Sequence, residues 1–229
     1  MEEALKTFFV LLATIVIYVV MKKIYVICPI PLFLPVLTSS ILIIVILKFY
    51  NVSYETYMAG GKWLDLLLGP AVVALAYPLY NQKQRILKYK GPIIGGVLIG
   101  LATGILSGIF FSIMLGISKS FLLSLLPKSM TTPVAIQIST GLGGIPSVTV
   151  ACVMVAGISG AILGPIILKL FCINSSLGRG IAFGSASHAI GTSKAMEYGE
   201  ATFSTSTVSM TLTALFGSIF ISIITKFFI

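Results

Sequence analysis

Charged side chains are scarce in this chain of 229 residues. Only 9% of the residues are Asp, Glu, Lys or Arg, against about 25% in ordinary soluble domains. So few charges argue against a soluble globular domain. Hydrophobic residues make up 57% of the chain, and its mean hydropathy is +1.10. We therefore expect an all-α polytopic membrane protein that forms one integral membrane domain over residues 1–229.

Acidic residues are the scarcer of the two signs, with 6 Asp and Glu against 15 Lys and Arg and a net charge of +9. The basic residues occur in short clusters between apolar runs, which is typical of cytoplasmic membrane loops. We expect no nucleic-acid partner. The densest cluster, residues 81–90, has four basic and no acidic residues, so it should lie in the cytoplasm.

Histidine and cysteine are also rare, with one and three copies. Cys28, Cys152 and Cys172 lack the spacing of a zinc site or a disulfide framework. No nucleophile is accompanied by a base and an orienting group, and no glycine-rich phosphate loop joins a strand to a helix. We expect no metal, no cofactor and no enzymatic activity.

What the chain does have is long apolar runs. A membrane span needs about 20 apolar residues, and the first run lacks the features of a cleaved signal peptide, so we expect it to be retained. Full spans are predicted over residues 5–21, 30–47, 63–80, 92–115, 145–171 and 208–228, with a polar loop at 48–62. Two further segments, 121–141 and 181–200, are interrupted or polar. The sequence therefore predicts six to eight transmembrane segments, two of them broken or re-entrant.

The first interruption is a proline-rich stretch over residues 126–137. Pro133 is suited to the first position of a new helix, with Thr132 as its N-cap. Because a helix N-terminus attracts anions, this break could hold a carboxylate. Lys128 would add a charge to such a site, or it could instead extend to the membrane interface. The candidate binding residues here are Lys128, Thr131, Thr132, Pro133 and Gln137.

The second interruption, residues 181–196, is too polar to face lipid. It is either a re-entrant hairpin or a helix surrounded by protein. His188, the single histidine, has a reference pKa of about 6.5; it could couple proton movement to transport, bind the ligand, or serve as a packing group. The candidate binding residues here are Ser187, His188, Gly191 and Thr192.

A weak internal repeat connects these segments. Residues 69–76 resemble residues 132–139, and each is followed by a glycine-rich span that begins with proline. We expect N-terminal spans at 1–60, repeat-like units at 61–115 and 123–171, and a polar segment with the last span at 181–229. Interrupted helices in repeated units are typical of secondary transporters. The secondary candidates for the site are Asp65, Gly69, Pro70 and Arg179.

The charge pattern also bears on topology. If segment 121–141 crosses the membrane, the connection that holds Lys169 and Arg179 lies outside. If the segment enters and returns, that connection lies inside with the other basic clusters. The positive-inside rule therefore favours re-entry. In the span 92–115, glycines at four-residue spacing predict a face for close helix packing.

Four stretches of the sequence resemble the LrgB/CidB family. They are Gly69-Pro70-Ala71 with residues 77–80, the run from Pro127 to Pro133, residues 143–147, and residues 187–192. Bacterial members of that family are known as antiholin-like proteins that modulate murein hydrolase activity and autolysis. Plastid relatives carry glycolate and glycerate, and some bacterial relatives are implicated in pyruvate uptake.

The resemblance implies a multi-pass protein of the bacterial plasma membrane that carries small monocarboxylates, with proton coupling left open. The alternative is an antiholin-like regulator of autolysis. The expected partners are the carboxylate, the lipid bilayer, a small holin-like protein of the LrgA/CidA type, and further copies of the chain, with a dimer favoured.

Overall fold

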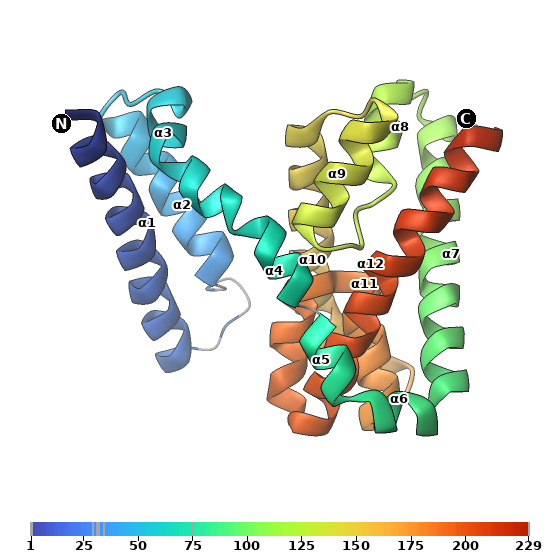
Figure 1. Ribbon diagram of the computed structural model, residues 1–229. Helices are drawn as coiled ribbons and strands as arrows, with labels where there is room; N and C mark the ends of the chain where they lie inside the picture. Colours follow the sequence, from blue (N-terminus) through green and yellow to red (C-terminus); the bar gives the residue numbers. More distant parts are fainter. Residues whose placement is uncertain (1, 29, 31–32, 34, 75, 229) are drawn as a thin grey trace. The chain divides into compact units, whose positions relative to one another are not determined.

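The computed structural model describes residues 2–228 except 29, 31–32, 34 and 75, and shows only helices and their connections in these ranges (Figure 1). This confirms the all-α prediction. The contacts separate residues 1–71 from residues 72–229 as two compact units. Four described helices, one of them near the N-terminus, are long and apolar enough to cross a membrane.

The first unit contains α1 (Glu2–Ile27), α2 (Pro35–Phe49) and α3 (Tyr54–Leu66). Helix α1 packs against both α2 and α3. Gly60 of α3 allows a close approach, since a Cβ there would lie 2.7 Å from Cβ of Val10. The predicted loop at 48–62 is wrong for most of its length, because Ser53 caps α3 by accepting a hydrogen bond from the Thr56 amide.

The predicted span at 63–80 is interrupted at Leu67. Helix α3 ends at Leu66, and α4 (Leu68–Ala74), α5 (Ala76–Asn81) and α6 (Lys83–Lys88) follow. The break at Leu67 precedes Gly69-Pro70, as expected from the incompatibility of proline with a helix interior.

Three long helices form the frame of the second unit: α7 (Lys90–Met114), α10 (Pro146–Leu170) and α12 (Glu200–Phe228). The first two match their predicted spans. Helix α12 begins eight residues before the predicted position, because Ser and Thr lower the hydropathy of its first turns. These hydroxyls bond back to the helix, as Thr205 Oγ1 does to the Ala201 carbonyl at 2.9 Å, so the turns can be buried.

The first interruption forms a helical hairpin. Helix α8 (Lys119–Leu125) runs inward, residues 126–131 turn, and α9 (Thr132–Leu142) returns toward the same end (Figure 1). Both helices contact α10. The Ile145 amide donates to Ser124 Oγ at 2.7 Å, which fixes the start of α10 against α8. We call α8 and α9 the first hairpin.

The second interruption also doubles back. Helix α11 (Ser176–Ala195) has non-helical dihedral angles at Ser187 and His188. Beyond this break the chain returns, since the Arg179 guanidinium lies 5.0 Å from the ring centroid of Tyr198. A continuous helix would place residues 19 positions apart about 28 Å from each other. The structure therefore selects the hairpin over the single enclosed helix, and we call the two arms of α11 the second hairpin.

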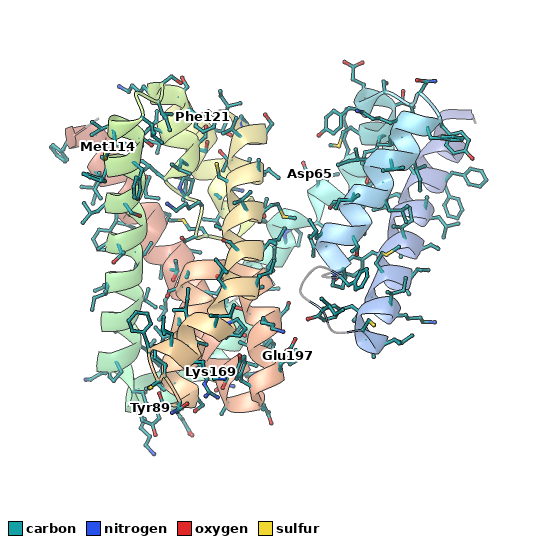
Figure 2. The ribbon with its side chains drawn as sticks, turned by 180° about the vertical axis from the view of Figure 1, so that it is seen from behind. Asp65, Tyr89, Met114, Phe121, Lys169 and Glu197 are labelled. Carbon is teal, nitrogen blue, oxygen red and sulfur yellow. The ribbon has the colours of Figure 1, made fainter. Side chains whose placement is uncertain are left out.

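The two hairpins enter from opposite ends of the second unit (Figure 1). Each follows a long helix, α7 for the first and α10 for the second, and these helices run in opposite directions. Figure 2 places Met114 and Phe121 at one end, and Tyr89, Lys169 and Glu197 at the other. The basic cluster that ends at Lys90 and the connection after Lys169 thus share an end, which the positive-inside rule assigns to the cytoplasm.

Candidate functional site

The tips of both hairpins line one cavity of about 730 Å³, which opens to the surface beside the exposed Val155; we call it the central cavity. The first hairpin contributes Lys128 and Ser129 from its turn, and the second contributes Ala186 and Ser187 from its break. Helix α10 forms a largely apolar wall that includes Val148, Ala151, Val155 and Ala156. The two interruptions that the sequence singled out therefore meet at one place.

Lys128 is the one charged residue among the described residues that line the central cavity. Its Nζ donates to the Gly104 carbonyl of α7 at 3.3 Å. An ammonium group has three donors, so this bond leaves capacity for a ligand. The contact directs the side chain toward α7 inside the unit, which favours the binding-site interpretation over extension to a membrane interface.

The glycine stripe of α7 makes room for both hairpins. A Cβ at Gly96 would lie 2.6 Å from Ile181 Cγ2, and one at Gly100 would lie 3.0 Å from Ser185 Oγ. One at Gly108 would lie 3.5 Å from Lys128 Nζ. The predicted close-packing face is confirmed, and the segments packed on it belong to this chain. Gly95 is not part of the face, since nothing lies within 4 Å of a Cβ there.

The N-terminus of α9 lies beside the Lys128 turn. Its N-cap is Thr131, one residue before the predicted Thr132, and Pro133 lies in the first turn. Thr131 is buried, and its Oγ1 has no hydrogen-bond partner in the described part of the chain. Of the remaining candidates on α9, Gln137 is exposed. None of the four candidates on this helix is among the residues that line the central cavity; they are Thr131, Thr132, Pro133 and Gln137.

His188 fixes the tip of the second hairpin to α10. The ring is 2% exposed, and its Nε2 lies 2.9 Å from the Val153 carbonyl. A carbonyl only accepts hydrogen bonds, so Nε2 carries a proton. Gly157 leaves the space for this contact, because a Cβ there would lie 2.7 Å from the ring.

The other two candidates on α11 position the hairpin, Gly191 against its opposite arm and Thr192 against α12. A Cβ at Gly191 would lie 2.7 Å from the Phe183 carbonyl of the opposite arm. Thr192 Oγ1 lies 2.9 Å from Ser206 Oγ on α12. Of the nine primary candidates, Lys128 and Ser187 line the central cavity, and the other seven are not among its lining residues.

The secondary candidates are not among the residues that line the central cavity. Asp65 is exposed on α3 and Gly69 and Pro70 lie on α4, all within the first unit. Arg179 lies near the start of α11, at the end of the second unit assigned to the cytoplasm.

Residues on α10 are the main component that sequence reasoning missed. Cys152, Ser159 and Gly160 line the central cavity. A Cβ at Gly160 would overlap Ser187 Oγ and lie 2.7 Å from Ser187 Cβ. The available signal was the spacing of Gly157, Gly160 and Gly164, because small residues at helical spacing mark close packing in membranes.

The backbone at His188 gives a stability prediction. Its φ of +41° is a conformation that favours glycine. We expect His188→Gly to be more stable than His188→Ala by about 1–3 kcal/mol, because both variants lose the Val153 contact but only the alanine variant retains the backbone strain. Thermal unfolding in one detergent measures the difference. Equal stability of the two variants would show that the backbone at this residue is unstrained.

Comparison with known proteins identifies relatives over the whole chain. The sequence model of one family, described as LrgB-like, matches residues 14–227. The chain is 57% identical over 220 residues to Bacillus subtilis "Uncharacterized protein YxaC", covering 96% of each. It is 40% identical to "Holin-like protein CidB" of Staphylococcus epidermidis and 34% identical to that of Staphylococcus aureus, each over 228 residues and 100% of both chains. No solved structure matches the chain.

Proposed function

The chain belongs to the LrgB-like family of holin-like membrane proteins, and from this premise and the central cavity we propose that it carries small monocarboxylates across the bacterial plasma membrane. The substrates are of the glycolate, glycerate or pyruvate class. The observation that carries the proposal is the meeting of two oppositely directed hairpins at a cavity beside a single lysine. Interrupted helices that meet inside a membrane protein are typical of secondary transporters.

The charge of the cavity lining supports a singly charged substrate. Lys128 provides one positive charge, and the wall formed by α10 is largely apolar. The N-terminus of α9 begins just after the Lys128 turn and adds the partial positive charge of a helix end near the cavity, although its first residues do not line it. One carboxylate is matched by the single charge of Lys128, whereas a second carboxylate would have no cationic partner in the described lining.

His188 is our candidate for proton coupling. Its Nε2 is engaged by the Val153 carbonyl, and it is adjacent in sequence to Ser187, which lines the cavity. A change in the protonation of the ring would therefore act directly on the tip of the second hairpin. If His188 couples protons to transport, uptake by the His188→Gln variant should no longer depend on a proton gradient.

Transport by the purified protein tests the proposed function. Proteoliposomes are loaded with buffer and offered labelled pyruvate, glycolate or glycerate, with and without the small holin-like partner. We expect saturable uptake of at least one of the three. Absence of saturable uptake under both conditions would contradict the carrier proposal.

The name of the CidB relatives supports a second candidate, an antiholin-like regulator of murein hydrolase activity that acts on a small holin-like protein. In this case Lys128→Gln should leave the control of autolysis intact. The glycine face of α7 is not available for that partner, because Ile181, Ser185 and Lys128 of the same chain cover it. Loss of both uptake and lysis control in Lys128→Gln would mean that regulation depends on carboxylate flux.

A further inference from the structure

A second cavity, of about 510 Å³, lies at the end of the second unit that the positive-inside rule assigns to the cytoplasm. It is formed by the last turns of α10, the connection that follows and Tyr198 after the second hairpin. We call it the basic pocket, because its lining includes Lys169 and Arg179 and no carboxylate among the described residues. It shares no lining residue with the central cavity.

The Arg179 guanidinium is held in place on three sides. Nε donates to the Ile173 carbonyl at 2.9 Å, and Nη2 donates to Asn174 Oδ1 at 3.0 Å. The guanidinium also lies over the Tyr198 ring, 5.0 Å from its centroid. A guanidinium has five N–H donors, and the two hydrogen bonds use two of them. The remaining three are fixed in position, so an anion can bind with little loss of side-chain entropy.

No carboxylate is among the described residues that line the basic pocket. The one salt bridge shown between described residues joins Lys194 to Glu197 at 2.6 Å. Lys169 is exposed and lies on the last turn of α10. Two cations on one pocket that contains a fixed guanidinium favour an anion with several oxygens, such as phosphate.

The surroundings of the basic pocket indicate a lipid as the source of that phosphate. Three apolar side chains near Lys169 at the end of α10 are strongly exposed, with exposed fractions of 62% for Ile166, 74% for Leu170 and 69% for Phe171, the C-cap. In a membrane these side chains would contact acyl chains. The pocket therefore lies where an apolar surface meets the cytoplasmic interface, at the depth of lipid headgroups.

We propose that the basic pocket binds the phosphate group of an anionic phospholipid. Lys169 and Arg179 contact the phosphate oxygens, Asn174 and Tyr198 hold Arg179 in position, and the acyl chains lie along the end of α10. The site is independent of the carrier function, since it is separate from Lys128 and requires no transport.

Titration of the detergent-solubilised protein with short-chain phosphatidylglycerol, read by native mass spectrometry, tests the proposal. We expect phosphatidylglycerol to bind more tightly than phosphatidylcholine, and we expect Lys169→Gln and Arg179→Gln each to weaken its binding about tenfold. Lys169→Gln removes only an exposed charge and should fold normally. Lys62→Gln, which removes an exposed lysine on α3 that lines neither the basic pocket nor the central cavity, is the matched control and should bind like the unchanged protein.

A separate titration with inorganic phosphate distinguishes a lipid headgroup from free phosphate as the ligand of the basic pocket. Weak binding of phosphate alone, at a concentration far above that of the lipid, is expected if the acyl chains contribute. Competition by phosphate at equal concentration would identify a soluble phosphate as the ligand of the same pocket. Equal binding of both lipids by the unchanged protein and by the Lys169 and Arg179 variants, with no binding of phosphate, would overturn the proposal.

Discussion

Replacing Lys128 by glutamine is expected to abolish most of the uptake of small monocarboxylates while leaving the protein folded. Lys128 is the one charged residue in the described lining of the central cavity. Glutamine keeps a donor for the Gly104 carbonyl and removes the charge. Loss of a charge-assisted bond to a carboxylate costs about 1.5–3 kcal/mol, which is roughly a 10- to 150-fold loss of apparent affinity. Initial rates of uptake into proteoliposomes, over a range of substrate concentrations, measure it.

Lys119→Gln is the matched control for this prediction. Lys119 begins the same hairpin, is exposed, and is not among the residues that line the central cavity. It should transport normally. An unchanged substrate affinity in Lys128→Gln would show that the lysine does not bind the carboxylate, and the positive end of α9 would become the principal candidate.

Replacing Gly160 by alanine is expected to displace the tip of the second hairpin. The added Cβ would overlap Ser187 Oγ and lie 2.7 Å from Ser187 Cβ. Overpacking of a close contact costs about 1–3 kcal/mol. Because Ser187 lines the central cavity, we expect both the initial rate of uptake and the unfolding temperature to fall.

A second substitution provides the critical check. Ser187→Gly removes both atoms that the new Cβ would meet, and leaves Cα of residue 187 at 3.8 Å, an ordinary contact. The double variant Gly160→Ala with Ser187→Gly should therefore be more stable than Gly160→Ala alone. Gly95→Ala, where nothing lies within 4 Å of the added Cβ, should be tolerated. If the double variant were no more stable than Gly160→Ala, the predicted clash would not be the cause of its instability.

The interrupted segments could be predicted from the sequence because each rests on local chemistry. Pro133 is incompatible with a helix interior, so a new helix had to begin near it, and the structure differs only in taking Thr131 as the N-cap. The polar composition around His188 was incompatible with contact to lipid. Neither rule specifies the direction of the chain after the break, so the hairpin at Ser187 and His188 remained one of two alternatives.

The predictions were wrong where polar residues lie within a helix. The first turns of α12 are rich in Ser and Thr and have low hydropathy, yet Thr205 and Ser206 are fully buried. Their burial is possible because α11 packs against this face through Gly180 and Gly184. Helix α3 is also rich in polar residues, and for that reason the sequence predicted a loop there.

The sequence by itself determined that this protein is a helical membrane protein with two broken segments and a lysine at the first break. Apolar length, proline chemistry and charge distribution act within a few residues, so they can be read along the chain. Only the tertiary structure decided that the two breaks are the tips of opposed hairpins, that both line the central cavity, and that α10 forms its wall. These facts depend on contacts such as that between His188 and Val153, 35 residues apart, and no local pattern specifies which distant carbonyl a buried side chain will reach.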